Sequence, residues 1–164
     1  MAYLLDANVF IEAKNRYYGM EFCPAFWDWL IQKNADDQVL SIEKVGDELV
    51  AGTDELAKWA AARGEKLFRP VDEAVLPSLA ELGNWVRGQK FRPSAISTFL
   101  EGTDYYLVAY AHAHKHVVAT LEVPSDGVRG VKIPNACIGM GVKFVTPFEM
   151  LRHERARFVL GGKS

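Results

Sequence analysis

Short apolar runs that each end near a single acidic residue constrain this sequence more than any other feature. The first run, Tyr3–Leu5, ends at Asp6, and hydrophobic residues resume at Val9. An apolar run of this length predicts a buried strand. Ligands of open α/β sheets bind beyond the carboxyl ends of the strands, so Asp6 is a candidate site residue. The alternative interpretation is an ordinary turn aspartate, because Asp is common in turns.

Similar apolar runs recur along the chain and alternate with segments of helical periodicity. We predict further strands at 39–41, 68–71, 117–120 and 142–146. We predict helices at 9–14, 22–31, 42–49, 54–63, 72–87, 104–116, 133–138 and 147–157, with a frayed tail at 161–164. We predict helix caps at four polar residues: Asn8, Ser41, Thr53 and Thr103. We expect Phe22 on the buried face of the helix at 22–31. Alternation of this kind is typical of a parallel sheet covered on both faces, a three-layer α/β/α sandwich. A chain of 164 residues is long enough for one such domain, spanning 1–164, and too short for two.

The helix after the second strand carries a candidate acid at the edge of its apolar face. Ile42, Val45 and Leu49 recur at helical spacing and are expected to face the sheet. A rotation of about 100° per residue places Glu48 beside Val45, and Glu43 at the opposite edge. Glu43 is also explained as an acid in the first turn, which favours the helix dipole. We therefore predict Glu48 as the site residue and keep Glu43 as the alternative.

Two more acids occupy positions that are not typical of acids on a solvent-exposed surface. Asp104 shares a helix face with Leu107 and Val108, so its carboxylate is expected to lie partly inside the protein. A buried carboxylate is costly unless it is paired or coordinated. Glu122 lies just beyond the predicted strand at 117–120, in the same kind of position as Asp6.

Four of these acids can meet at one edge of the predicted sheet: Asp6, Glu48, Asp104 and Glu122. Clustered carboxylates repel one another and bind protons or a cation. Oxygen ligands without Cys or clustered His favour Mg²⁺ or Mn²⁺. A site of this kind supports phosphodiester hydrolysis. We predict that Asn8 and Thr120 hold these carboxylates or a water molecule by hydrogen bonds.

Two basic segments are candidate contacts for a polynucleotide backbone. The first contains Arg87, Lys90 and Arg92, with an aromatic residue among them, and the second contains Arg129 and Lys132. Cations interleaved with an aromatic ring suit phosphates and a base. The formal net charge of −2 excludes a generally basic protein, but a local basic rim is enough for RNA binding. Basic loops that serve solubility alone are the alternative.

Remaining side chains of metal-binding type do not form a recognisable ligand set. Cys23 and Cys137 are far apart without metal spacing, and we predict free thiols. His112 and His116 have the spacing of a metal-binding pair but lack an HExxH pattern, and cationic side chains also suit a helix C-terminus. The sequence shows no charged leader with an apolar core and no membrane-spanning run, so we expect a cytoplasmic protein.

The sequence resembles the PIN-domain family, the ribonuclease fold of VapC-like bacterial toxins. The residues that carry the resemblance are 5–10, 45–49, 104–111 and 117–122. The resemblance implies a parallel sheet of strand order 3-2-1-4-5 and cleavage of single-stranded RNA. It also implies that Asp6, Glu48, Asp104 and Glu122 hold Mg²⁺ or Mn²⁺. The chain departs from many VapC-like proteins in having Glu122 in place of Asp. The segment Lys132–Cys137, in a longer loop, is similar to a smaller PIN branch.

The function expected from these features is a metal-dependent endoribonuclease that acts as the toxin of a type II toxin–antitoxin pair. Its partners would be a single-stranded or structured RNA and a cognate antitoxin, and a homodimer is compatible with this prediction. The main alternative is a non-catalytic PIN module that binds RNA or a protein. A phosphatase of the haloacid-dehalogenase type needs a second acid two residues after Asp6, where this chain has Asn8.

Overall fold

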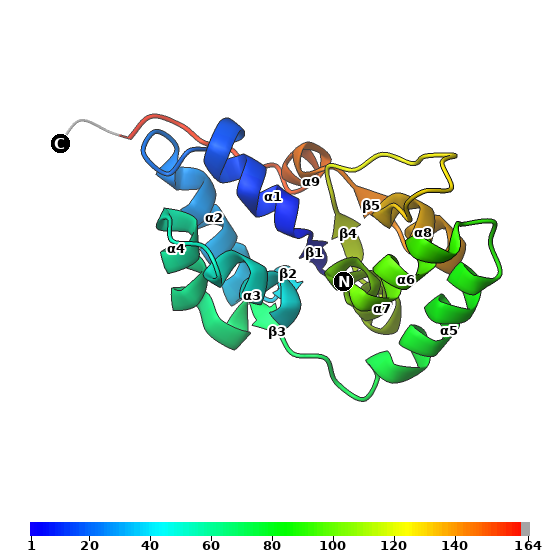
Figure 1. Ribbon diagram of the computed structural model, residues 1–164. Helices are drawn as coiled ribbons and strands as arrows, with labels where there is room; N and C mark the ends of the chain where they lie inside the picture. The colour runs from blue at the N-terminus through cyan, green and yellow to red at the C-terminus, as the bar shows by residue number, and fades with distance from the viewer. Residues whose placement is uncertain (162–164) are drawn as a thin grey trace.

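A five-stranded parallel sheet forms the centre of the protein in a computed structural model, which describes residues 1–161 (Figure 1). The strands are β1 (Tyr3–Leu5), β2 (Val39–Ile42), β3 (Phe68–Arg69), β4 (Val117–Ala119) and β5 (Phe144–Val145). Their spatial order is β3-β2-β1-β4-β5, and every pair is parallel. The order expected from the PIN resemblance is therefore confirmed.

Helices surround this sheet and complete the three-layer α/β/α architecture that the sequence predicts (Figure 1). Helix α7 packs on both β2 and β4 and is itself covered by α5, while α2 packs against β2. The α-helices are α1 (Ala7–Glu12), α2 (Pro24–Ala35), α3 (Glu43–Val50), α4 (Glu55–Arg63), α5 (Val75–Arg87), α6 (Pro93–Glu101), α7 (Thr103–His114), α8 (Ile133–Met140) and α9 (Pro147–His153). A π-helical turn (Ala13–Tyr17) follows α1, and a 3₁₀ turn (Gly64–Lys66) follows α4.

Strand β1 lies in the middle of the sheet, and its register aligns the strand ends that carry polar residues. Tyr3 is opposite Val39 of β2, and Leu5 is opposite Ala119 of β4. The residues that follow β1, β2 and β4 therefore reach the same edge of the sheet. Strands β1, β2 and β4 are short and almost wholly buried, which matches their largely apolar sequence.

Two predicted hydroxyl caps have tertiary roles instead. Ser41 was expected to begin the helix after the second strand, but it lies within β2, where its buried Oγ donates a hydrogen bond to the carbonyl of Leu5 at 2.7 Å. Thr103 was expected to cap α7, but it is the first residue of that helix and its hydroxyl points to Glu48. A third cap, at the start of α4, was expected to be Thr53. The structure has Asp54 in this role, because the Asp54 carboxylate accepts the N–H of Ala57.

Replacing Ser41 by alanine is expected to lower the free energy of unfolding by about 1–3 kcal/mol, because a fully buried hydrogen bond to Leu5 is lost. Urea denaturation followed by circular dichroism measures the change. Ser97 lies exposed on α6 and is the matched control, since its replacement by alanine should change stability by less than about 0.5 kcal/mol. Equal effects of the two substitutions would contradict the assigned role of Ser41.

Several local expectations differ from the structure. Helix α6 was not predicted, although Pro93 at its first position and the buried pair Ala95 and Phe99 mark it. Phe22 was placed on a buried helix face, but it precedes α2 and is 64% exposed. The predicted tail at 161–164 lies outside the described residues beyond Gly161.

The prediction of two free cysteines is confirmed. Cys23 and Cys137 are both free thiols. None of the helices within residues 1–161 has both the length and the hydrophobicity needed to cross a bilayer.

Candidate metal and substrate site

Asp6 and Glu122 are connected through one buried hydroxyl. Asp6 directly follows β1 and is only 4% exposed, and Thr120, which follows β4, is 1% exposed. The Thr120 hydroxyl donates to Asp6 Oδ2 at 3.2 Å and accepts the N–H of Glu122 at 3.1 Å. The Glu122 carboxylate in turn accepts the N–H of Ile133, at the start of α8, at 3.4 Å. The parallel pairing of β1 and β4 thus brings these two acids to one place.

Glu48 and Asp104 reach the same edge from two helices. Glu48 lies on α3, which begins immediately after β2, and Asp104 lies in the first turn of α7. Thr103 donates a hydrogen bond of 2.5 Å from its hydroxyl to Glu48 Oε1, which ties α7 to α3 beside Asp104. As expected, Leu107 and Val108 are fully buried below Asp104, which is half-buried.

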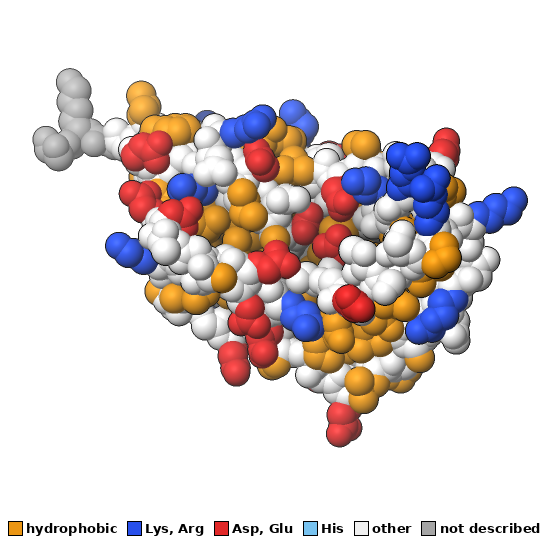
Figure 2. Space-filling view, in the orientation of Figure 1, with side chains coloured by type: hydrophobic (Ala, Val, Ile, Leu, Met, Phe, Trp, Pro, Cys, Tyr) orange, Lys and Arg blue, Asp and Glu red, His pale blue; other side chains and the backbone are white. Residues whose placement is uncertain are grey.

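Electrostatic coupling joins the four acids into one cluster. Burial is the main factor that raises the pKa of Asp6 to about 6, and the charges of Glu122 and Glu48 raise it further. Burial also raises the pKa of Asp104 to about 7, with added repulsion from Asp6, Glu122 and Glu48. Lys132 partly opposes this shift. Figure 2 shows acidic side chains gathered at the centre of this face, between the α1–α3 side and the α6–α7 side.

The donor set fits a hard divalent cation, but the carboxylates lie too far apart to enclose one without moving. All four side chains offer oxygen, which Mg²⁺ and Mn²⁺ prefer. The pKa values of Asp6 and Asp104 are raised mainly by burial and further by the neighbouring acids, and a bound cation would oppose both effects. Within residues 1–161, no three Asp, Glu, His or Cys side chains are arranged closely enough to hold a metal ion. Glu48 and Glu122 each accept a hydrogen bond from the protein, and each keeps a second carboxylate oxygen for a cation.

The structure distinguishes Glu48 from Glu43 on the same helix. Glu48 lines a pocket with Asp104, whereas Glu43 lines a separate pocket with Gly46 and Phe68. Glu48 is therefore the α3 acid that faces the cluster. Asn8 was expected to cap the first helix, but Asp6 is the capping position and Asn8 is an exposed residue of the first turn.

Only part of the predicted basic rim lies at the acids. Arg129 lines the pocket that contains Glu48 and Asp104, and the charge of Lys132 acts on Asp104. Arg92 is exposed at the start of α6, and Lys90 is exposed in the preceding connection. Arg87 lies farther away on α5, where its guanidinium covers Gly83. Figure 2 shows Lys and Arg side chains beside the acidic centre, over the loop between β4 and α8.

A backbone contact brings the two basic segments together. The N–H of Arg92 donates to the carbonyl of Val128 at 2.9 Å. The same loop is tied to α8 because Asn135 accepts the N–H of Ser125 at 2.9 Å and donates to its carbonyl at 2.8 Å. The unusual Lys132–Cys137 segment thus anchors the loop that carries Arg129.

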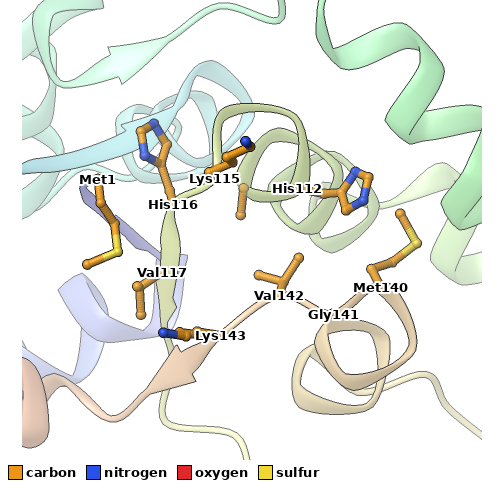
Figure 3. Close-up of a pocket in the computed structure, with 10 residues that line it drawn as sticks. Met1, His112, Lys115, His116, Val117, Met140, Gly141, Val142 and Lys143 are labelled. Atoms are coloured by element: carbon orange, nitrogen blue, oxygen red, sulfur yellow. The ribbon is translucent and has the colours of Figure 1, made fainter.

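A second pocket, of about 330 Å³, lies at the opposite edge of the sheet and contains the two candidate histidines (Figure 3). His112 Nδ1 is 2.7 Å from the hydroxyl of Ser78, and His116 Nδ1 accepts the N–H of Ala2 at 3.1 Å. Burial is the main factor that lowers the pKa of His116 to about 4, so its ring is neutral at pH 7. The two rings lie apart and contact different partners (Figure 3).

Thr103 is the site residue that the sequence interpretation missed. Its adjacency to Asp104 was visible, but its hydroxyl was assigned to a helix cap. The contact with Glu48 depends on the packing of α7 against α3, which no local pattern encodes.

Comparison with known proteins gives a family but no annotated relative. No curated protein matches the chain, and no solved structure matches it. A family model described as a domain of unknown function, DUF4411, matches residues 3–158, which include all four acids of the cluster. The chain therefore belongs to the DUF4411 family.

Proposed function

We propose that this protein is a metal-dependent endoribonuclease of the PIN type. The observation that carries the proposal is the mutual repulsion of four carboxylates at the carboxyl edge of a parallel sheet. A purely structural role does not explain such a cluster, because like charges around the buried Asp6 destabilise the folded protein. Cation binding would relieve the repulsion, and the strand order agrees with the resemblance to PIN domains.

Each group of residues has a separate task in this proposal. Asp6, Glu48, Asp104 and Glu122 would hold Mg²⁺ or Mn²⁺, and Thr120 would keep Asp6 in position through its hydrogen bond. The bound metal would lower the pKa of a water molecule and neutralise charge on the phosphate. Hydrolysis would leave a 5′-phosphate and a 3′-hydroxyl. Arg129 and Lys132 would attract the RNA backbone, since both lie close to the acids.

Incubation of the purified protein with structured and unstructured RNA, with and without Mg²⁺ or Mn²⁺, tests the proposal directly. Cleavage that requires the metal and stops on chelation supports it. Helix α3 supplies a matched pair of variants: Glu48→Gln should reduce cleavage, while Glu43→Gln, in a different pocket, should leave it unchanged. No cleavage of any RNA by the wild-type protein, or equal cleavage by both variants, would count against the proposal.

Replacing Thr120 by valine is expected to weaken divalent-ion binding by roughly 10- to 100-fold, because Asp6 loses the donor that orients it. Valine has nearly the shape of threonine, so the change isolates the hydroxyl. Isothermal titration calorimetry with Mn²⁺ measures the effect. Thr53→Val is the control, since Thr53 is exposed before α4 and lies in a different pocket from Glu48 and Asp104. Unchanged Mn²⁺ affinity in Thr120→Val would show that the Asp6 site does not bind the ion.

Calorimetry also separates the nuclease from a non-catalytic PIN module. A module that only binds RNA or a protein should show little affinity for divalent ions. The further proposal that the enzyme is a toxin with a cognate antitoxin predicts growth arrest on expression of the wild-type chain. Glu48→Gln should relieve the arrest and Glu43→Gln should not. Normal growth during expression of active wild-type enzyme would contradict the toxin role but not the nuclease.

A further inference from the structure

A pocket of about 390 Å³ opens directly beside two of the acids and has distinct walls. Its charged lining residues are the acids Glu48 and Asp104 and the cation Arg129. Its volume lies within the range of pockets that bind small organic ligands. It is therefore large enough for more than a hydrated metal ion.

One face of α6 forms a wall that is suited to a planar ring with polar edges. Ser94, Ala95, Thr98 and Phe99 follow the helical spacing and all line the pocket. Ala95 and Phe99 are buried and give apolar contact, while the hydroxyls of Ser94 and Thr98 are exposed. Bases bind proteins by such a combination of apolar contact and hydrogen bonds to their edges.

The pocket is lined by charges of both signs, which act differently on a bound phosphate. Among residues 1–161, Arg129 makes no ion pair, so its guanidinium is available to an anion. A phosphate beside Glu48 and Asp104 would be repelled unless a metal ion were bound to these acids. A phosphate beside Arg129 is attracted with or without the metal. The loop that carries Arg129 is held in place by the Arg92–Val128 and Ser125–Asn135 contacts.

We propose that this pocket binds the nucleoside next to the scissile phosphate, with the following phosphate on Arg129 and the base against α6. This inference rests on the proposed nuclease function and assigns its base preference to Ser94 and Thr98. The chemistry that the pocket recognises is a nucleoside monophosphate within a single strand. In a paired strand the base edge would not be free to contact α6.

The binding test uses metal-free protein and nuclear magnetic resonance. Uridine and adenosine 3′-monophosphates, which carry the phosphate assigned to Arg129, are titrated in turn, and the backbone amides of Gly102 and Gly130, which line the pocket, are followed. Gly141, which lines the pocket at the opposite edge of the sheet, is the internal reference. We expect at least one nucleotide to shift Gly102 and Gly130 and to leave Gly141 unchanged. No shift with either nucleotide, or equal shifts with inorganic phosphate, would overturn the proposal.

Two neighbouring residues of α6 provide a matched pair of variants. Thr98→Phe places a ring in the pocket and should weaken nucleotide binding at least tenfold. Ser97→Phe adds the same ring at an exposed residue that does not line the pocket and should not change binding. Arg129→Ala should weaken binding of the nucleotide roughly tenfold and leave the unphosphorylated nucleoside unaffected. Equal binding by Thr98→Phe and Ser97→Phe would also overturn the proposal.

Mapping of cleavage sites keeps this inference separate from the nuclease proposal. Thr98→Val is expected to change the base preference at one position beside the cut by about three- to tenfold. Cleavage whose base distribution is unchanged in Thr98→Val and Thr98→Phe would overturn the pocket assignment alone. Nucleotide binding that depends on Thr98, in a protein that cleaves no RNA, would support the pocket and overturn the nuclease.

Discussion

Replacing Asp104 by asparagine is expected to abolish RNA cleavage and, at the same time, to stabilise the metal-free protein at pH 7. The loss of a metal-binding carboxylate removes several kcal/mol of transition-state stabilisation, roughly a thousandfold in rate. Asparagine has a similar shape but no charge, so it removes the repulsion from Asp6, Glu122 and Glu48. Because Asp104 is partly exposed and screened by solvent, we expect a gain of about 1–3 kcal/mol in stability.

The two readouts together distinguish a functional acid from a structural one. Cleavage assays and urea denaturation are made on the same preparations, with Asp47→Asn as the control, because Asp47 is an exposed acid of α3 in the pocket of Glu43. If the Asp104 carboxylate had only a structural role, neutralising it would make the folded protein less stable. Loss of both cleavage and stability in Asp104→Asn would therefore refute the assignment, and so would full cleavage.

The metal-free protein is expected to contain two carboxyl groups that make it less stable as the pH rises from about 4 to 7. The pKa of Asp6 in the folded protein is about 6 and that of Asp104 about 7, both above the ordinary value of 3.8. Between these values the folded state holds protons that the unfolded state has released, so raising the pH favours unfolding. Below about pH 4 both states are protonated at these groups, and their destabilising effect disappears. Mg²⁺ or Mn²⁺ should restore stability near pH 7.

Other groups titrate in the same range, so the effect is measured as a difference between proteins. The pKa of His116 is lowered to about 4, which makes this residue destabilise the fold as the pH falls below 6.5. Thermal melting of the wild type and of Asp104→Asn from pH 4 to 8 cancels this contribution. The gap between the two proteins should widen towards pH 7 and narrow when Mn²⁺ is added. A gap that is independent of pH would contradict the assigned pKa of Asp104.

The sheet and the four acids could be predicted because both depend on local patterns. Short apolar runs marked β1, β2 and β4, and polar residues directly after them marked the strand ends. Helical spacing placed Glu48 and Asp104 at the edges of apolar faces, where the structure has them. Parallel strands end at a shared edge, so the convergence follows from topology.

Side chains whose partners come from distant segments could not be predicted in the same way. Ser41 and Thr103 both looked like helix caps, because the local sequence around them is typical of caps. Each hydroxyl instead bonds to a residue brought close by packing, Leu5 in one case and Glu48 in the other. The pocket beside Asp104 was also hidden, since it needs α6 and the loop carrying Arg129 to face each other.

The central place of β1 has a consequence for the newly made protein. Since β1 pairs with β4, the first strand of the sheet gains one of its two neighbours only after residues 117–119 have left the ribosome. Glu122 and the amide of Ile133 that holds it come later still. A nascent chain that ends before β4 therefore lacks Glu122 and the residues that hold it and Asp6 in place, Thr120 and Ile133. A destructive activity built on this topology would stay silent during translation until β4 and the start of α8 have been made.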